Sequence, residues 1–441
     1  MTTDIFSEGI QIPILKYQKA GVVNQDLIDF LHMNVRLADR AMGDLRAQLT
    51  AIKTGERRFL ELVERYGRAD VEASIAAIMD QSETAARTRA AAIPDGVYEA
   101  ESFMDDDGVD IAEHVPIKVR VEVRRDEMTI DLSDVSKQVR GFYNSGITTG
   151  YACAQVAFKC LTSPTDYPIN DGSFRNLHTI VPAGRIVSAQ KPAPMRWWMT
   201  FPMTIVDTVF RALSPAIPDR VIAGHHADLI IAMFNGFNLA TSEFFIAFVG
   251  PTGGGWGAKS REDGVSATIC MNDGDTHNSP NEQAEAKFPV LVESNSLIMN
   301  SGGPGKHRGG LGIERVVLAR TNMIINTQID RVHCKPWGLN GGGDAMGNSV
   351  ALRLEGQWME DLPNAKVLTA QLKDGEAFRL RSGGGGGFGP AIERPAEIVA
   401  ADVKQGYISL AKAQEAYGVV VDPENFELDI AATEKLRQRM R

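Results

Sequence analysis

The sequence predicts an α+β fold in which a helical N-terminal part precedes mixed, glycine-rich β domains and a short helical C-terminal segment. Apolar residues recur every three or four positions over residues 24–92, as on one face of a helix. Apolar and charged residues alternate over 117–133, as along a strand with one solvated face. Beyond Pro251 glycine is dense between short β-like runs. We therefore expect a helical region over 1–92, an α/β-mixed region over 93–215, a glycine-rich β region over 216–380 and a C-terminal helical segment over 381–441.

The helical region should contain three helices. The first two predicted stretches are LIDFLHMNVRLADRAMGDLRAQLTAI and RFLELVERYG, and a third helix is expected across 69–92. Val71, Ile75, Ile78 and Met79 form the apolar face of that third helix, and the turn at residues 94–96, PDG, ends it.

The mixed region should contain a β-hairpin and two helices. The alternation in IKVRVEVRRDEMTIDLS predicts two strands with a turn at Arg125-Asp126. GYACAQVAFKCL and TIVDTVFRALSPAIP have the apolar pattern of helices that pack on a sheet.

The later elements are predicted from short β-like runs and from glycines that end helices. FFIAFVG, IERVVLAR and NSVALRLEG are strand candidates, separated by glycine-rich turns. RPAEIVAADVKQG and SLAKAQEAYG are helix candidates, and each ends at a glycine in the C-cap position.

Composition excludes several classes of protein. The 441 residues carry a formal net charge of −10 with a pI near 5.4, and a nucleic-acid partner would require clustered Lys and Arg. No run of about 18 apolar residues offers a membrane span, and the N-terminus lacks the pattern of a signal peptide, so we expect a cytoplasmic protein. Four dispersed cysteines form no Cys-x-x-Cys pair, which favours reduced, mostly buried thiols.

The stretch NSGGPGKHRGGLG resembles a phosphate-binding loop but fails the test for one. A Walker loop needs a leading glycine and a hydroxyl after Gly-Lys, and Asn300 and His307 occupy those positions. GGGWGA and GGGGFG match a dinucleotide-binding spacing, yet no convincing helix follows either. We expect tight turns where backbones approach closely, with loops that face substrate or a neighbouring subunit as the alternative.

Histidines, carboxylates and tryptophans supply the candidate chemistry. The adjacent His225 and His226 could bind a metal or transfer protons, although one of them would ordinarily serve the core. His277 is surrounded in sequence by carboxylates, which suits either a divalent ion or a solvated acidic loop. Trp197-Trp198 and Trp337 could wall a ligand pocket or pack in the core. The carboxylates around His277 are Asp273, Asp275, Glu282 and Glu285.

The order of motifs along the chain resembles the hydantoinase B / oxoprolinase family, which includes N-methylhydantoinase B, 5-oxoprolinase and subunits of the acetone and acetophenone carboxylases. The resemblance covers essentially the whole chain. The motifs that carry it, in order, are EGIQIP, NVRLADRAMGDLRAQ, PINDGSFRNL, VPAGRIV, PAPM, GGGWGAKSREDG, NSPNEQAE, NSGGPGKHRGGLG, KPWGLNGGG and SGGGGGFGP with the downstream ERP, DVKQGYIS and YGVV.

This resemblance implies a subunit of an ATP-dependent, multi-subunit enzyme that activates a carbonyl by phosphorylation. ATP and Mg would be bound by a hydantoinase A type partner subunit, and the substrate would be a small molecule with a carbonyl group. Hydrolysis of a cyclic amide is the first expectation and ATP-dependent carboxylation of a ketone is the alternative. A structural subunit without catalytic groups is the second alternative.

Two departures from the family pattern limit what can be carried over. Relatives have a His- and Asp-rich segment before the EGIQIP motif, which in the acetone carboxylases supplies ligands for a catalytic metal. Here only a few residues precede Glu8-Gly9, so ligands for a divalent transition metal such as Mn or Zn are not identifiable. We expect that either a further chain supplies that segment or the metal site has been lost. Asp134 stands where relatives often have glycine.

The candidate site residues follow from these motifs. Asp44, His225, His226 and Glu282 are the predicted catalytic residues. The predicted substrate-binding residues are Trp256, Asn278 and Arg308. For three of them a structural alternative stays open, because Asp44 could be a charge on a helix surface, Asn278 a turn former and Trp256 a packed side chain. Arg308 and Lys306 could meet an anionic intermediate that passes between subunits.

Overall fold

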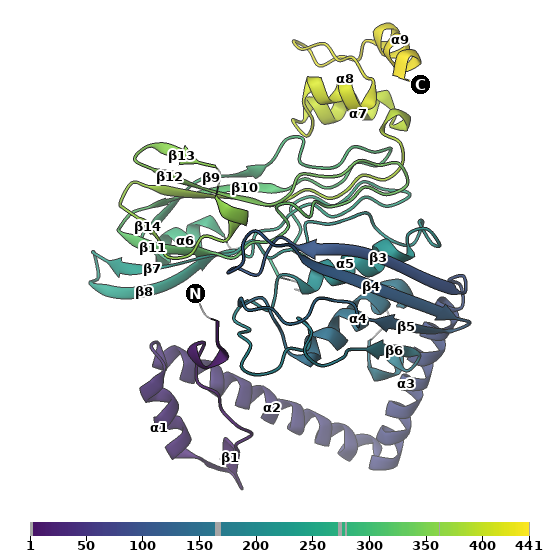
Figure 1. The fold of residues 1–441 in the computed structure, drawn as a ribbon. Coiled ribbons are helices and arrows are strands. Elements are labelled where there is room, and N and C mark those ends of the chain that lie inside the picture. The colour runs from purple at the N-terminus through teal and green to yellow at the C-terminus, as the bar shows by residue number, and fades with distance from the viewer. Residues whose placement is uncertain (1–2, 164–168, 272–275, 278–279, 361, 441) are drawn as a thin grey trace.

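The fold is α+β, as predicted, and three core clusters organise it. We describe a computed structural model of residues 3–163, 169–271, 276–277, 280–360 and 362–440. Figure 1 shows a helical arm at the N-terminal end, a central body of sheets and a small helical unit at the C-terminal end. Within the described residues, no helix is long and apolar enough to cross a membrane.

The N-terminal arm is helical, as predicted, but the bounds of its first two helices differ from the predicted stretches, because residues 35–37 are not helical and the second helix runs on from there through both stretches. The helices are α1 (Gln25–Asn34), α2 (Ala38–Tyr66) and α3 (Arg68–Ala90), and a two-stranded ribbon of β1 (Gln18–Lys19) and β2 (Val22–Val23) precedes them. Gly67 separates α2 from α3 with a φ of 85°. The arm is anchored by a hydrogen bond from the Ile5 amide to the Pro192 carbonyl, and by amides of residues 195 and 196 that donate to the Glu8 carboxylate.

The first sheet has the order β3-β4-β5-β6 and carries the predicted hairpin. Its strands are β3 (Gly96–Met104), β4 (Val115–Arg124), β5 (Glu127–Asp131) and β6 (Leu177–Ile180). β4 alternates buried and exposed side chains, and Arg125 turns the chain with a φ of 57°. The predicted helices α4 (Ile147–Thr162) and α5 (Pro202–Leu213) contribute to the same core as this sheet.

Two further sheets share a second core. One has the order β14-β11-β7-β8, and the other the order β13-β12-β15-β10-β9. The strands of the first sheet are β14 (Ala370–Leu372), β11 (Met323–Thr327), β7 (Ala232–Asn238) and β8 (Glu243–Val249). The strands of the second sheet are β13 (Gln357–Met359), β12 (Ser349–Leu354), β15 (Ala377–Arg381), β10 (Ile313–Ala319) and β9 (Val290–Leu297). Helix α6 (Asn281–Lys287) precedes β9. The predicted strands at 244–250, 313–320 and 348–356 are thus confirmed.

The glycine-rich segments 253–258, 301–312, 337–343 and 383–389 lie side by side and form what we call the glycine block (Figure 1). Their amides donate to backbone carbonyls of neighbouring segments, for example from Gly310 to Trp256 at 2.9 Å and from Gly385 to Gly310 at 2.9 Å. A Cβ on Gly309 would lie 1.6 Å from the Gly385 carbonyl oxygen. The expected close approach of backbones is therefore confirmed.

The expected tight turns account for few of these glycines. In the glycine block only Gly341 and Gly389 have a positive φ, at 92° and 71°. The other glycines are required because no side chain fits between the segments, and not because the backbone must adopt a left-handed conformation.

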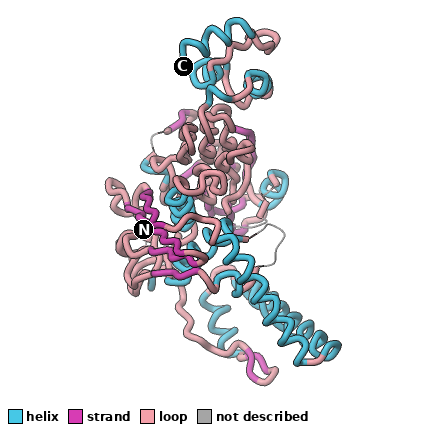
Figure 2. Tube along the Cα trace, turned by 90° about the vertical axis from the view of Figure 1, so that its right-hand side faces the viewer, coloured by secondary structure: helices cyan, strands magenta, loops and turns pink. Residues whose placement is uncertain are grey.

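The C-terminal helices α7 (Ala396–Lys404), α8 (Leu410–Tyr417) and α9 (Ile430–Met440) form a unit with its own small core. Figure 2 shows this unit projecting beyond the loop-rich part of the body. Gly406 and Gly418 follow α7 and α8 with positive φ values of 76° and 61°, which confirms the predicted glycine stops. The division of the chain into four regions stays a prediction.

The glycine block generates a stability prediction. Gly385→Ala places a Cβ 1.8 Å from the Trp256 carbonyl oxygen, so two segments must separate and their hydrogen bonds must lengthen. We expect the free energy of unfolding to fall by about 3 kcal/mol or more in urea titrations. The control is Gly43→Ala in α2, where the nearest atom is an Arg46 side-chain nitrogen at 4.0 Å. Equal stability of the two variants would contradict a close-packed glycine block.

Candidate functional site

The two predicted histidines lie in the loop between α5 and β7, and both side chains are completely buried. The loop is held against the glycine block, because the His226 amide donates to the Gly255 carbonyl at 3.1 Å and the Gly224 amide donates to the Trp337 carbonyl at 2.8 Å. A Cβ on Gly254 would lie 2.4 Å from Cγ of His226. The glycine block thus fixes where both imidazoles lie.

Asp207 of α5 is the partner that organises this region. Its carboxylate accepts hydrogen bonds from the Trp337 indole at 2.9 Å and from Arg331 at 3.2 Å, and Nδ1 of His225 lies 3.3 Å away. Burial alone would raise the pKa of Asp207, but Arg331, His225 and the indole outweigh that cost and lower it. We call Asp207, His225, His226, Arg331 and Trp337 the histidine centre.

Several polar atoms of the histidine centre have no partner among the described residues. They include Nε2 of both histidines and Nε and one terminal nitrogen of Arg331. Burial, followed by the charge of His225, lowers the pKa of His226 to about 3. His226 is therefore neutral at physiological pH, and its Nδ1 lies 3.4 Å from the Gly255 carbonyl. Buried nitrogens of this kind suit water or a small polar ligand.

A second buried group, which we call the acidic cluster, surrounds Lys366. The Lys366 ammonium donates to Asp330 at 3.1 Å and to Asp106 at 3.4 Å. Burial raises the pKa of Asp228 to about 7. Burial and the nearby Asp330 raise the pKa of Asp105 to about 6. The acidic cluster comprises Asp105, Asp106, Asp228, Asp330 and Lys366.

Sequence reasoning missed the acidic cluster. The run Asp105-Asp106-Asp107 directly after β3 is a signal that could have found its first members, because consecutive carboxylates at the end of a strand are unusual for a core. Lys366 gives no such signal, since it lies 260 residues from Asp106 in the sequence. Within the described residues, no three His, Cys, Asp or Glu side chains are placed to hold a metal ion.

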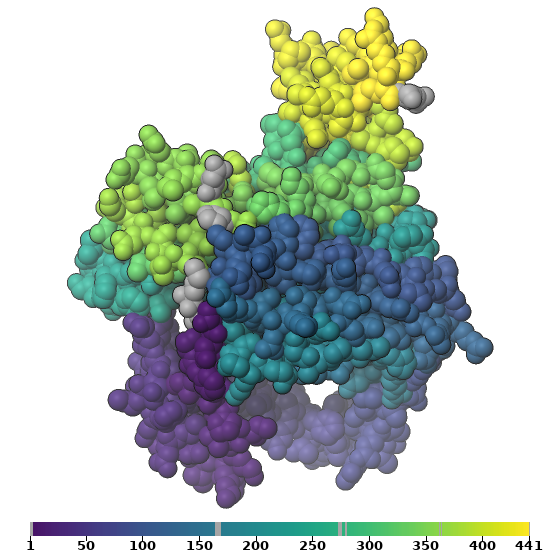
Figure 3. All heavy atoms as spheres, viewed as in Figure 1, coloured from purple at the N-terminus to yellow at the C-terminus, as the bar shows by residue number. Residues whose placement is uncertain are grey.

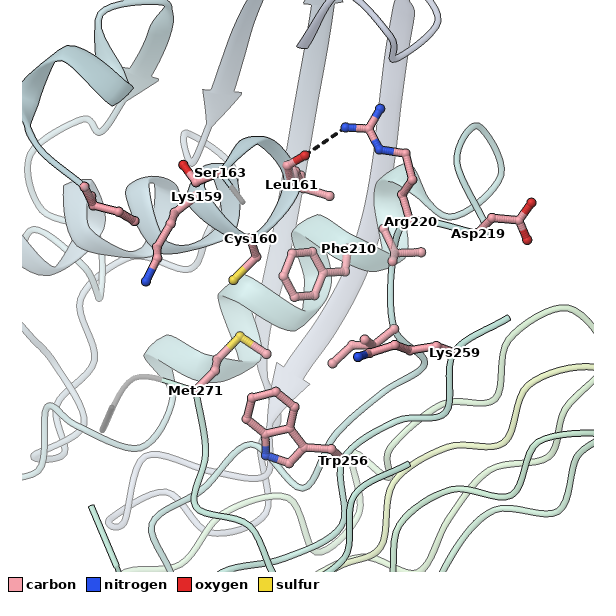
Figure 4. Close-up of a pocket in the computed structure, with 13 residues that line it drawn as sticks. Lys159, Cys160, Leu161, Ser163, Phe210, Asp219, Arg220, Trp256, Lys259 and Met271 are labelled. Carbon is pink, nitrogen blue, oxygen red and sulfur yellow. Dashed lines mark hydrogen bonds between the residues drawn. The ribbon is translucent and has the colours of Figure 1, made fainter. Parts of the chain in front are cut away.

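An open pocket of about 530 Å³ lies beside the histidine centre (Figure 4). Trp256, Phe210 and Met271 provide apolar walls. Lys159 and Arg220 bring positive charge, and no described carboxylate pairs with Lys159. The pocket is lined by Lys159, Cys160, Leu161, Ser163, Ile169, Phe210, Asp219, Arg220, Val221, Ile222, Trp256, Lys259 and Met271.

Trp256 connects the pocket with the histidine centre. Its indole nitrogen donates to the Ile269 carbonyl at 3.0 Å, which fixes the ring, and its ring centroid lies 6.2 Å from that of His225 in an edge-to-face arrangement. The half-buried ring of Trp256 thus forms a pocket wall and also packs against His225. Of the other tryptophans, Trp337 and Trp197 are buried, whereas Trp198 lines a separate groove beside α4.

The structure brings His225, His226 and Trp256 together and places the other described candidates, Asp44, Glu282 and Arg308, elsewhere. Asp44 is exposed on α2, and Glu282 is exposed in the first turn of α6. Asn278 lies outside the described residues, as do Asp273 and Asp275 of the predicted divalent-ion group around His277.

Arg308 belongs to the joint between the glycine block and the C-terminal unit. It is buried and pairs with Asp402 of α7 at 3.4 Å, and its guanidinium lies over the Tyr407 ring. Arg394 binds the same Asp402 at 2.9 Å and also binds Asp263. These contacts give Arg308 a structural partner on its own chain.

Comparisons with known proteins give a consistent result. Residues 1–391 match the family described as Hydantoinase B/oxoprolinase. The beta subunit of the caprolactamase of Pseudomonas jessenii is 32% identical over 443 residues, which cover 98% of this chain and 74% of that protein. The putative B component of a D-/L-hydantoinase of Pseudomonas sp. (strain NS671) is 30% identical over 447 residues, 99% of this chain and 74% of its own length.

A carboxylase subunit and a solved structure are also similar to this chain. The delta subunit of the acetophenone carboxylase of Aromatoleum aromaticum is 24% identical over 480 residues, which cover 99% of this chain and 69% of that protein. In the crystal structure of the ATP-dependent caprolactamase from Pseudomonas jessenii, one chain matches this fold with a TM-score of 0.86 at 28% identity, covering 98% of this chain and 76% of that one.

The histidine centre generates a prediction about stability. Asp207→Asn removes the counter-charge of a buried guanidinium, so we expect the free energy of unfolding to fall by about 3–5 kcal/mol in urea titrations. Glu262→Gln is the matched control, because its pair with Lys259 is exposed and such pairs contribute at most about 1 kcal/mol. Similar losses in the two variants would show that Arg331 does not depend on Asp207.

The acidic cluster generates a prediction about pH. The pKa of Asp228 is raised in the folded state, so the folded chain binds a proton more tightly than the unfolded chain does. The free energy of unfolding should then fall as pH rises from about 4 to about 7, by up to about 4 kcal/mol from this group. Asp228→Asn should flatten that slope in urea titrations at several pH values. An unchanged slope would exclude Asp228 as its source.

Proposed function

Because this chain belongs to the hydantoinase B/oxoprolinase family, we propose that it is a subunit of an ATP-dependent cytoplasmic complex that hydrolyses a cyclic amide. The family match over residues 1–391 carries this proposal. The relatives that support it are components of a caprolactamase and of a hydantoinase, and the solved caprolactamase is described as ATP-dependent.

ATP and Mg are assigned to a hydantoinase A type partner subunit. The glycine block supports this assignment. Its amides could have bound phosphate, but they donate to backbone carbonyls instead, as those of Gly303 and Gly387 do. A transition metal such as Mn or Zn finds no ligand set among the described residues of this chain, so no step is assigned to one.

The pocket of Figure 4 is the proposed binding site for the cyclic amide. Its volume of about 530 Å³ suits a small molecule, and the rings of Trp256 and Phe210 can pack on a flat heterocycle. Phosphorylation of the carbonyl oxygen, with ATP from the partner, activates the ring carbon toward water. The C–N bond then breaks with a proton transferred to the leaving nitrogen, and a second water releases phosphate from the acyl phosphate that remains. Lys159 and Arg220 then hold positive charge where negative charge develops as water attacks the carbonyl carbon.

The histidine centre has a positioning role in this proposal. Asp207 orients His225, and His225 packs against the indole of Trp256. These contacts hold the pocket wall in place. His226 is neutral, and its Nε2, which has no partner among the described residues, would accept a hydrogen bond from water that enters the centre. Asp44, Glu282, Asn278 and Arg308 stay candidate residues from the sequence.

Two alternatives remain as distinct hypotheses. Membership of an ATP-dependent ketone carboxylase is supported by the similarity to the delta subunit of the acetophenone carboxylase. A purely structural role is supported by the complete burial of both histidines. The alternatives differ in what they require, because a carboxylase depends on bicarbonate and a structural subunit contributes no pocket residue to turnover.

The proposal is tested on the complex purified through a tag on this chain, with cyclic amides or with ketones plus bicarbonate as substrates. Ring opening without bicarbonate supports the hydrolase, and turnover of a ketone that requires bicarbonate would replace it with the carboxylase. We expect Trp256→Ala to lower kcat/KM for the amide by about 10–100-fold, with Trp256→Phe milder. Trp198→Ala, in the separate groove, is the control. Full activity of Trp256→Ala in an intact complex would remove the pocket from the mechanism.

A further inference from the structure

The pocket of Figure 4 is larger than a cyclic amide requires. Its volume is about 530 Å³, whereas a cavity of about 150 Å³ already holds a six-membered ring. A ring that packs on Trp256 and Phe210 therefore leaves more than half of the pocket free. Pockets enclose most of the surface of the ligand that they bind, so the free volume indicates a further part of the substrate.

The two sides of the pocket differ in chemistry. In Figure 4, Cys160 and Met271 lie on one side of the Phe210 ring and Arg220 lies on the other. The guanidinium suits the carbonyl oxygen that is phosphorylated, because negative charge develops there. The side with Cys160 and Met271 is apolar apart from Lys159, which precedes Cys160 in the sequence, and we assign the free volume to this side.

Sulfur and aromatic groups suit this side to a large apolar substituent. The thioether of Met271 is flexible and polarisable, so it adapts to different shapes, and sulfur packs favourably against aromatic rings. A substituent that fills this side loses its contact with water, which strengthens binding in proportion to its apolar surface. An unsubstituted ring leaves Cys160 and Met271 in contact with water and gains nothing from them.

Cys160 limits the size of such a substituent. It lies in the last turn of α4, where its short side chain lines the pocket. The end of α4 is fixed, because the Arg220 guanidinium donates to the Leu161 carbonyl at 2.8 Å and to the Arg89 carbonyl of α3 at 3.2 Å. An opening separates the middle of α2 from the body (Figure 3), whereas this joint at the end of α3 is held by hydrogen bonds. Because the helix is held in place, the room on this side depends on the size of residue 160.

Given a pocket that binds a cyclic amide, as in the proposed function, we propose that the substrate carries a large apolar substituent on its ring and that Cys160 determines how large this substituent can be. The ring packs on Trp256 with its carbonyl toward Arg220. The substituent lies against Cys160 and Met271, on the far side of Phe210. The pocket then distinguishes substrates by their substituent.

Protection of the Cys160 thiol tests the proposal without requiring turnover. Cys160 is the one described cysteine that is exposed, and the other three are buried. The complex is treated with N-ethylmaleimide at alkaline pH, since desolvation raises the pKa of this thiol, and labelled Cys160 is measured by mass spectrometry. We expect benzylhydantoin to halve the labelling rate at a concentration roughly 10–100-fold lower than hydantoin does, because it buries an additional phenyl ring.

Gln155→Cys provides a matched control for the labelling. Gln155 is exposed on the same helix, outside the residues that line the pocket, so neither compound should slow labelling at this position. Equal protection of Cys160 by the two compounds, or protection by neither, would overturn the proposal. Selective protection by benzylhydantoin in a complex that opens neither ring would support the substituent side while contradicting the proposed hydrolysis.

A change of size at residue 160 tests its role in specificity. Cys160→Phe fills the side that is assigned to the substituent, so the ratio of kcat/KM for benzylhydantoin to kcat/KM for hydantoin should fall by at least about tenfold. Gln155→Phe adds a ring outside the pocket and should leave this ratio unchanged. Circular dichroism and co-purification of the partner verify that both variants fold and assemble. A ratio indifferent to Cys160→Phe would overturn the role of Cys160.

Discussion

Close packing of glycine backbones is the constraint on which the rest of this structure depends. Four segments distant in sequence run side by side with hydrogen bonds between their backbones, and at Gly309 and Gly385 there is no room for a Cβ. The two flanking sheets, the histidine loop and the C-terminal unit all connect to this block. Because the contacts are between backbone atoms, they are rigid and leave little freedom for the elements they hold.

Buried charged side chains form further joints between elements of the fold. The histidine centre joins α5 to the loop after β11, the acidic cluster joins the end of β3 to Lys366, and the Arg308, Arg394 and Asp402 group joins the glycine block to α7. Each joint buries ion pairs, so that removing one partner leaves another charge unpaired in a low-dielectric interior. Such joints specify the relative placement of elements more strictly than apolar packing does.

The pocket is built on this rigid frame. Trp256 belongs to the glycine block. Its ring lines the pocket and also packs against His225. Lys159 comes from α4 and Arg220 from the segment after α5, so the cationic wall is assembled from elements of the first core. In the proposed site, a wall fixed by backbone packing would hold the ring of the substrate, and these cationic side chains would stabilise the charge that develops on it.

The sequence by itself determined many local elements: the helical character of residues 25–90, the helices α4, α5, α7 and α8, the hairpin of β4 and β5 and the glycines that end α7 and α8 follow from periodicity and from caps, which act within a few residues. It did not indicate α9 or where α1 ends and α2 begins. It also identified His225, His226 and Trp256 as candidates. Only the tertiary structure decided that these three meet, that Arg308 binds Asp402 and that Lys366 is surrounded by carboxylates. The reason is physical: a glycine-rich segment is compatible with a turn, a loop or a close-packed backbone, and which of these forms depends on segments far away in the sequence, as Gly385 is from Gly310 and from Trp256.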